Sequence, residues 1–275
     1  MTDAFITVAE LADLLAAGEP VTVLDVRWQL MQPDGRADHQ RGHIPTAVYV
    51  SLDGELSDHA VTGRGRHPLP SGTQLQDAAR RWGVRRGVPI VVYDDWNRAG
   101  SARAWWVLRA AGIQDVRILD GGLGAWTAAG HALETGSVEP ERGDVVVVHE
   151  DLYAGAMPTL TADEAAVHPN LLDARAPERF RGEVEPVDAV AGHIPGARNL
   201  PSTAVLTEDG TVLSEDELSA LGWTFGGSEQ VGVYCGSGIT AAVLVAALAA
   251  AGVDAALFPG SWSQWSSDDR PVETS

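Results

Sequence analysis

The feature that most constrains the fold of this chain is an internal duplication. Four short motifs occur in the first half and again, in the same order, in the second half. The pairs are LDVR (24–27) with LDAR (172–175), GHIPTA (42–47) with GHIPGA (192–197), IVVYDD (90–95) with VGVYCG (231–236), and LDGGLGAW (119–126) with FPGSWSQW (258–265). Solenoid repeats recur every 20 to 45 residues or so, so this spacing indicates one domain fold used twice.

The duplication predicts two domains. The chain has 275 residues, which exceeds the usual size of a single domain. The stretch GSVEPERGD (136–144) has the composition of a linker. We therefore expect an N-terminal domain over residues 1–138, a linker over 139–158 and a C-terminal domain over 159–275.

Each half alternates β-rich runs with helical patterns. Residues 21–26, 89–93 and 116–119 are expected to form buried strands. Residues 101–111 are expected to form a helix. This alternation predicts an α/β fold in which each domain has a mainly parallel sheet with helices on both faces. Ligands of such sheets bind beyond the carboxyl ends of the strands, and Cys235 follows a strand expected over residues 231–234.

Composition argues against several classes of partner. The chain has 38 acidic and 19 basic residues and a formal net charge of −19, which would repel nucleic acid. The longest apolar run, residues 241–251, is too short to span a bilayer, so no membrane partner is expected. A single cysteine excludes an intrachain disulfide, and the first residues lack the pattern of a signal peptide. We expect a cytoplasmic protein.

That single cysteine lies in the stretch VGVYCGSGITAAVLVAALAAAG (231–252). It stands between a predicted strand and a helix expected from about Thr240 onward. Gly236 and Gly238 allow the loop to curl so that its N–H groups converge on the sulfur, and a helix N-terminus favours negative charge. The pattern predicts that Cys235 is a thiolate nucleophile; the alternative is a buried cysteine that packs as a small hydrophobic residue.

Two chemistries use a thiolate in such a loop. Cysteine phosphatases and arsenate reductases need an arginine six residues after the cysteine, and Ala241 occupies that position, so phosphoryl transfer is disfavoured. In sulfur transfer, the thiolate attacks a sulfane or thiol sulfur, becomes a persulfide and passes the sulfur to an acceptor. Neither a cofactor nor a metal is expected: in HQRGH (39–43) no third zinc ligand is evident, and Gly42 and Pro45 break the helix that would align both histidines.

Further motifs accompany the cysteine loop along the chain. They are the paired GHIP motifs, DARAPERFRG (173–182), CGSGIT (235–240) and GSWSQW (260–265). Together they resemble the two-domain rhodanese family of sulfurtransferases, over nearly the whole chain. The resemblance implies two tandem rhodanese-like domains of which only the second is catalytic. The sequence agrees, because aligning Tyr93 with Tyr234 places Asp94 at the position of Cys235.

The residues after the cysteine distinguish the sulfur donors within this family. The resemblance implies that cations in the loop accompany thiosulfate, whereas neutral residues accompany 3-mercaptopyruvate. The residues here are Gly236, Ser237, Gly238, Ile239 and Thr240. The loop therefore favours 3-mercaptopyruvate, with both glycines, the isoleucine and the threonine in the substrate site. The alternatives are a thiosulfate:cyanide type of sulfurtransferase and a non-catalytic rhodanese-like binding module.

The chain as a whole is strongly acidic, so a small anionic donor needs nearby cations in order to bind. Arg179 matches the family arginine that binds the donor anion; the alternative is a surface ion pair with Glu178 or Glu183. Many 3-mercaptopyruvate enzymes carry a second arginine shortly before the glycine-histidine pair. Residues 183–192 contain neither Lys nor Arg, and Val187 falls where that arginine would be.

The resemblance also implies a relay in which the loop serine, Ser237, acts with a histidine and an aspartate of the first domain. His43 matches that histidine, and Asp38 is a candidate for the acid. The alternative for His43 is a structural role, since His193 occupies the same motif in the other half. Trp28 matches a position near the active site that could exclude water from the persulfide. The expected acceptors are a thiol, cyanide or a thioredoxin-like protein.

Overall fold

The computed structural model describes residues 4–222 and 230–275, and the chain divides into two compact units. Unit 1 comprises Met1–Asp58, Leu69–Ala156 and Thr207–Val212, and unit 2 comprises His59–Pro68, Met157–Leu206 and Leu213–Ser275. One short segment of each half therefore belongs to the unit formed mainly by the other half. The boundaries expected from the sequence, with a linker over 139–158, stay a prediction.

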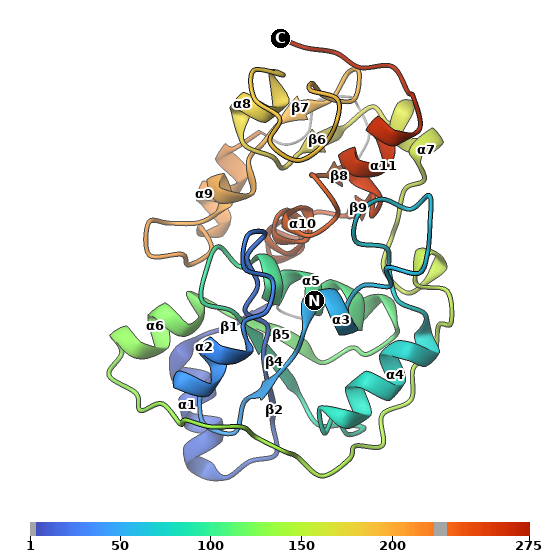
Figure 1. Ribbon diagram of the computed structural model, residues 1–275. Helices are drawn as coiled ribbons and strands as arrows, with labels where there is room; N and C mark the ends of the chain where they lie inside the picture. Colours follow the sequence, from blue (N-terminus) through green and yellow to red (C-terminus); the bar gives the residue numbers. More distant parts are fainter. Residues whose placement is uncertain (1–3, 223–229) are drawn as a thin grey trace. The chain divides into compact units, whose positions relative to one another are not determined.

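Unit 1 is built on a five-stranded parallel sheet with the order β1-β5-β4-β2-β3 (Figure 1). Its strands are β1 (Phe5–Ile6), β2 (Thr22–Asp25), β3 (Val48–Tyr49), β4 (Ile90–Tyr93) and β5 (Val116–Leu119). Its helices are α1 (Val8–Ala17), α2 (Arg36–Arg41), α3 (Leu52–Glu55), α4 (Gly72–Arg81), α5 (Ala99–Ala110), α6 (Gly122–Ala128) and the 3-10 helix η1 (Leu152–Ala154).

Helices cover both faces of this sheet. Val91 and Tyr93 of β4 share a core with Leu11 of α1 and Trp126 of α6. Alternate strand residues point to the opposite face. The helix α5 contacts β4 and β5 and is buried along nearly its whole length. The expected strands and the helix after residue 100 are confirmed, and α5 begins slightly earlier than its pattern suggested.

Unit 2 repeats this arrangement on a four-stranded parallel sheet with the order β7-β6-β8-β9 (Figure 1). Its strands are β6 (Leu171–Asp173), β7 (Arg198–Asn199), β8 (Val231–Tyr234) and β9 (Ala255–Leu257). Its helices are α7 (Ala162–Ala166), α8 (Pro177–Phe180), α9 (Glu215–Ala220), α10 (Thr240–Ala250), α11 (Ser261–Ser267) and the 3-10 helix η2 (Ser202–Val205).

In unit 2, Tyr234 of β8 packs with Ala165 of α7 and with Trp262 and Trp265 of α11. The apolar helix α10 contacts β8 and β9 and is buried from its second residue through Leu248. The α/β fold with a parallel sheet and helices on both faces is thus confirmed. No helix within residues 4–222 and 230–275 has the length and apolar character needed to cross a membrane.

The repeated motifs meet one another inside each unit. In unit 2, Arg175 Nη2 lies 2.6 Å from Asp173 Oδ2 and donates to the Gly192 carbonyl at 2.6 Å. The Tyr234 hydroxyl accepts a hydrogen bond from the Ile194 N–H at 3.1 Å. Burial and the neighbouring Asp173 carboxylate raise the pKa of Tyr234 well above its ordinary value, so its hydroxyl stays protonated. Residues of the motifs LDAR, GHIP and VGVY therefore form one buried polar network.

The same network exists in unit 1. Arg27 Nη2 lies 2.8 Å from Asp25 Oδ2 and also donates to the Gly42 carbonyl. The Tyr93 hydroxyl donates to Asp25 at 2.8 Å and accepts from the Ile44 N–H at 3.1 Å. In each unit, the duplicated residues thus connect the end of one strand to the GHIP loop and to a neighbouring strand.

This network predicts the effect of Asp173→Asn. The change removes the nearer counter-charge of the buried Arg175 guanidinium and leaves only Glu185, 3.4 Å from Nη1, so it should lower the free energy of unfolding by about 3 kcal/mol, the lower end of the cost of breaking a buried ion pair. The control is Asp163→Asn, because Asp163 is 87% exposed in its pair with Arg270 and should contribute less than about 1 kcal/mol. Urea unfolding of both variants checks this, and equal losses would contradict it.

Candidate active site

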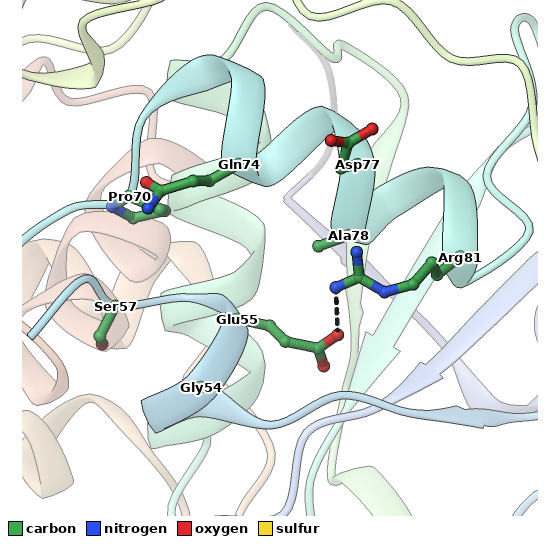
Figure 2. Close-up of a pocket in the computed structure, with 8 residues that line it drawn as sticks. All are labelled: Gly54, Glu55, Ser57, Pro70, Gln74, Asp77, Ala78 and Arg81. Atoms are coloured by element: carbon green, nitrogen blue, oxygen red, sulfur yellow. Dashed lines mark hydrogen bonds and ion pairs between the residues drawn. The ribbon is translucent and has the colours of Figure 1, made fainter.

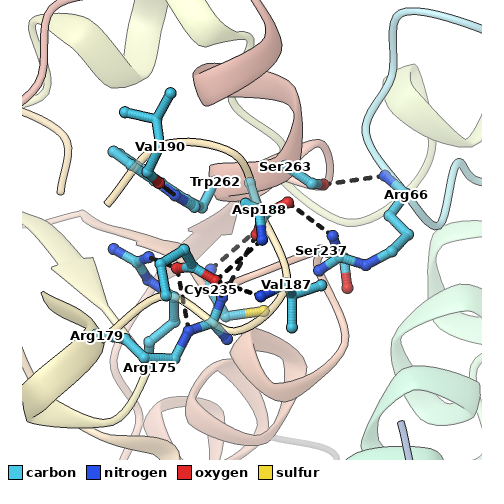
Figure 3. A network of polar contacts seen from close by, with 12 residues as sticks. Arg66, Arg175, Arg179, Val187, Asp188, Val190, Cys235, Ser237, Trp262 and Ser263 are labelled. Atoms are coloured by element: carbon cyan, nitrogen blue, oxygen red, sulfur yellow. Dashed lines mark hydrogen bonds and ion pairs between the residues drawn. The ribbon is translucent and has the colours of Figure 1, made fainter. Parts of the chain in front are cut away.

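Cys235 lies at the carboxyl end of β8, between that strand and α10 (Figure 3). It is 1% exposed, and its Sγ accepts a hydrogen bond from the Gly238 N–H at 3.2 Å. The N-terminus of α10 adds the partial positive charge of its free N–H groups. The arrangement of strand, glycine loop and helix can therefore stabilise an anion at the sulfur.

The loop depends on glycine at residue 238. Gly238 has φ +76°, a conformation that L side chains rarely adopt. A Cβ on this residue would lie 2.3 Å from the Pro259 carbonyl oxygen. Only glycine permits the turn that aims the residue 238 N–H at the sulfur.

The beginning of α11 holds the loop from the other side. The Cys235 N–H donates to Ser261 Oγ at 3.1 Å, and the Cys235 carbonyl accepts from the Trp262 N–H at 3.0 Å. The Gly236 carbonyl accepts from the Ser263 N–H at 2.9 Å. These bonds satisfy the buried backbone of the loop and fix the direction of the nucleophile.

Ser237 contacts His67, a histidine that none of the sequence motifs indicated. Its Oγ lies 2.8 Å from Nδ1 of His67, and the two residues are 6% and 4% exposed. His67 belongs to unit 2 through His59–Pro68. A hydroxyl and an imidazole nitrogen at this distance can exchange a proton beside the nucleophile.

A signal for His67 is present in the sequence but is weak. His67 lies in GRGRHPLP (63–70), where two arginines and a histidine stand together in a strongly acidic chain. The motif GHIP drew attention to His43 instead, because it is repeated.

Both histidines of the repeated motif make the same kind of contact. His43 Nδ1 lies 2.9 Å from the His39 carbonyl oxygen, and the two rings stack with centroids 4.0 Å apart. His193 Nδ1 lies 2.8 Å from the Phe180 carbonyl oxygen, and those rings stack at 3.8 Å. His43 is completely buried in unit 1. This equivalence favours a structural role for His43.

The other residues that the family resemblance placed near the relay also lie in unit 1. Asp38 pairs with Arg41 and accepts a hydrogen bond from Gln32 at 2.9 Å. Trp28 is buried, and its Nε1 donates to Asp53 Oδ1 at 2.9 Å. Their roles in catalysis stay predictions.

Asp94 follows β4 as Cys235 follows β8. Its carboxylate accepts a hydrogen bond from the Ser101 N–H at 2.9 Å and lies 3.1 Å from Arg98 Nη2. The loop of unit 1 thus holds an anion of its own, which is neutralised by a buried guanidinium group.

Arg179, the predicted donor-binding residue, lies beside the cysteine loop. Its Nη1 is 3.4 Å from the position that a Cβ on Gly236 would take. Its Nη2 lies 2.6 Å from Glu185 Oε1. Of the two partners suggested by the sequence, Glu183 pairs with Arg181 at 2.8 Å.

The carboxylate of Glu185 is held in its charged form. Burial acts to raise its pKa, but hydrogen bonds from Arg179 and from the backbone N–H groups of Asp188 and Val187 outweigh burial and lower the pKa. Glu185 Oε2 also lies 3.4 Å from Arg175 Nη1. This carboxylate therefore connects the buried network of unit 2 to Arg179.

The remaining predicted substrate residues lie in the same turn. Ile239 is 1% exposed, and Thr240 begins α10. Their contacts with substrate stay predictions. Within residues 4–222 and 230–275, no cluster of three or more histidine, cysteine, aspartate or glutamate side chains could hold a metal ion.

Unit 1 contains a separate pocket of about 270 Å³ (Figure 2). Glu55 and Arg81, which line it, pair with each other at 3.1 Å, and Asp77 pairs with Arg142 at 3.2 Å. Because these charges are satisfied on the surface of the unit, we assign the pocket no catalytic role.

Comparison with known proteins shows matches over both halves. The family model described as "Rhodanese-like domain" matches residues 7–129 and 159–268. A Mycobacterium tuberculosis protein, whose name gives thiosulfate sulfurtransferase SseB as a provisional assignment, is 65% identical over 273 residues, covering 97% of this chain and 95% of that protein.

Two further matches are named for a different substrate, 3-mercaptopyruvate. The 3-mercaptopyruvate sulfurtransferase of Escherichia coli K12 is 39% identical over 265 residues, covering 92% of each chain. The structure of the 3-mercaptopyruvate sulfurtransferase from Leishmania major superposes with a TM-score of 0.84 at 31% identity, covering 98% of this chain and 76% of that one.

The geometry of the loop predicts the effect of Gly238→Ala. The alanine combines a strained φ with a clash against the Pro259 carbonyl, so the loop must shift and the residue 238 N–H must leave the sulfur. We expect a loss of stability above about 2 kcal/mol and slower alkylation of Cys235 by iodoacetamide at neutral pH.

The matched control is Gly196→Ala. Gly196 has φ +78° with no atom within 4 Å of an added Cβ, so it carries the strain without the clash. It should cost about 1 to 2 kcal/mol and leave the alkylation rate unchanged. Equal alkylation rates in the two variants would show that the Gly238 N–H does not support the thiolate.

Proposed function

The chain belongs to the rhodanese family, and on that premise we propose that it moves a sulfur atom from 3-mercaptopyruvate to a thiophilic acceptor through a persulfide on Cys235. The observation that supports this choice of donor is the contact between His67 and Ser237, two residues after the nucleophile, because a hydroxyl and an imidazole at this distance could transfer a proton during the reaction. The donor sulfur would meet the thiolate at the end of β8.

The first half-reaction forms one bond and breaks one. The Cys235 thiolate attacks the donor sulfur and forms the S–S bond of the persulfide, while the electrons of the donor's C–S bond leave with the carbon as the enolate of pyruvate. The donor's thiol proton is lost from sulfur and one proton is gained by the enolate carbon. The products are a deprotonated persulfide and pyruvate.

This proton movement distinguishes 3-mercaptopyruvate from thiosulfate. Thiosulfate carries no proton at neutral pH, and its leaving group departs as sulfite without needing one. A buried hydroxyl hydrogen-bonded to an imidazole therefore assists the first donor and has no task with the second. The role that the family resemblance implied for His43 belongs, in this proposal, to His67.

A second candidate function is thiosulfate sulfurtransfer. The guanidinium group of Arg179 near Gly236 would suit a compact dianion, and the relative with the higher identity is named for that substrate. The persulfide step is the same for both donors. A non-catalytic binding module is disfavoured because the intact loop keeps Cys235 hydrogen-bonded to Gly238.

The second half-reaction returns the thiolate. A thiol, cyanide or a thioredoxin-like protein attacks the outer sulfur of the persulfide, and the Cys235 thiolate is the leaving group. The chemistry requires a reduced cysteine at the start of every cycle, which supports a cytoplasmic location.

The persulfide step predicts a change in mass. Incubation with 3-mercaptopyruvate should add one sulfur atom to the protein, which cyanide or a reducing thiol should remove. Intact mass spectrometry checks this, and Cys235→Ser should take up no sulfur. Sulfur uptake by that variant would show that the nucleophile has been wrongly assigned.

The relay predicts a donor-selective loss of activity. Ser237→Ala and His67→Gln should each lower kcat with 3-mercaptopyruvate by roughly 100-fold or more, because a general acid-base pair is lost. Turnover of thiosulfate, measured as sulfite release, should fall far less. His193→Gln, at the structural histidine of the same unit, is the control and should affect stability rather than the ratio of the two activities. A parallel loss for both donors would remove the argument for the relay.

A further inference from the structure

A fifth repeat accompanies the four motif pairs. The dipeptide Glu-Thr occurs at residues 134–135 and again at 273–274, each time at the same distance after the tryptophan that ends the last motif. Residues 132–135 and 271–274, which contain these dipeptides, are called here the straps of unit 1 and unit 2. Each strap belongs to the same unit as the motif that precedes it.

Both straps pair with the GHIP loop of their own unit through backbone hydrogen bonds. The His43 N–H donates to the Glu134 carbonyl and the Glu134 N–H donates back, both at 2.9 Å. The His193 N–H donates to the Glu273 carbonyl at 2.8 Å, and the Glu273 N–H donates back at 3.0 Å. The side chain of each glutamate also accepts a backbone N–H of that loop, at 2.9 Å in unit 1 and 3.2 Å in unit 2. The two straps are therefore equivalent in their contacts.

In unit 2 the strap joins two elements that build the active site. At one end, Nε1 of Trp265 donates to the Pro271 carbonyl at 2.8 Å, and Trp265 belongs to α11, which holds the cysteine loop. At the other end, a Cβ on Gly182 would lie 2.7 Å from the methyl group of Thr274. Gly182 closely follows α8, the helix that carries Arg179. The strap thus connects the support of the nucleophile to the support of the predicted donor-binding arginine.

His193 continues this connection into α8. Its backbone pairs with Glu273, while its Nδ1 lies 2.8 Å from the Phe180 carbonyl oxygen and its ring stacks on Phe180 with centroids 3.8 Å apart. Phe180 is the last residue of α8 and directly follows Arg179. This helix has only four residues and no side-chain cap. A helix so short is held in place by its tertiary contacts rather than by its own hydrogen bonds.

Unit 1 has the same strap without a nucleophile. His43, paired with Glu134, contacts the helix α2 through the His39 carbonyl, as His193 contacts α8. The residue that corresponds to Cys235 is Asp94. The strap of unit 1 is therefore a natural control, because the same contacts support a loop that cannot attack sulfur.

We infer that the strap of unit 2 is a positioning element of the active site, in which Glu273 acts through His193 and α8 to set where the Arg179 guanidinium lies relative to Cys235. This inference rests on the proposed function, with Arg179 as the residue that binds the donor's anionic group. Because Glu273 acts through other residues, its loss should weaken donor binding more than the chemical step.

Glu273→Pro and Glu134→Pro form a matched pair of variants. Each proline removes the N–H that donates to the histidine carbonyl, which opens the bridge between strap and loop. Both should lower the melting temperature. Only Glu273→Pro should raise KM for 3-mercaptopyruvate, by roughly fivefold or more with little change in kcat, because a charged hydrogen bond to the donor is misplaced. Glu273→Gln keeps the backbone bridge and a side-chain acceptor, so steady-state kinetics should show a normal KM.

Alkylation of Cys235 gives a readout that needs no turnover. Iodoacetamide is neutral and iodoacetate carries a carboxylate, so the ratio of the iodoacetate rate to the iodoacetamide rate reports the positive charge beside the sulfur. This ratio should fall in Glu273→Pro toward its value in Arg179→Ala, and it should stay unchanged in Glu134→Pro. A general loss of stability would change both rates together and leave their ratio unaltered.

Two results would overturn the role of the strap. One is an unchanged KM and alkylation ratio in Glu273→Pro, and the other is an equal change in Glu134→Pro. If Glu273→Pro does not fold, Glu273→Ala removes the side-chain contact with the Gly196 N–H, with Glu134→Ala as its control, and an unchanged KM in Glu273→Ala overturns the inference. Unmodified protein that takes up no sulfur on Cys235 would instead overturn the proposed function, and the alkylation ratio would still test the strap.

Discussion

The buried ion pair between Asp173 and Arg175 is the interaction on which the active site depends. It joins the end of β6 to the Gly192 carbonyl, and the hydroxyl of Tyr234 completes the same network. Tyr234 is the residue before Cys235, so the network fixes the position at which β8 ends and the cysteine loop begins. A buried pair of this kind adds little net stability over an apolar core, but it penalises every arrangement that separates its partners. Its repetition in unit 1 explains why the same residues recur in the sequence.

The loops that follow these two networks carry different side chains at equivalent positions. In unit 1, Asp94 accepts a hydrogen bond from the Ser101 N–H of α5 and is neutralised by Arg98, whose side chain occupies space beside Gly122. In unit 2, Cys235 stands at the corresponding position, and its Sγ accepts a hydrogen bond from the Gly238 N–H. The same fold thus supplies a loop of this kind twice, and on the proposed function the sulfur atom would be the anion that it holds in unit 2.

Local patterns carried most of what could be predicted from the sequence. Each repeated motif, each predicted strand and the cysteine loop can be recognised from a few consecutive residues, and the structure confirms the fold that they indicated. His67 could not be placed in this way, because its segment, His59–Pro68, precedes the rest of unit 2 by about ninety residues and no spacing rule links the two. The repeated GHIP motif drew attention to His43, although repetition marks a contact that both units need for folding.

Charge compensation shapes how this chain can recognise an anionic donor. The net charge of −19 means that an anion is attracted only by local groups, and both arginines near Gly236, Arg66 and Arg179, are already paired with carboxylates. An anion that approached these arginines would compete with the carboxylates already paired with them, so it would gain less than two unpaired guanidinium groups could provide. On the proposed function, discrimination among donors would come from the sulfur end, where the loop N–H and the Ser237–His67 pair would act on charge that changes during the reaction.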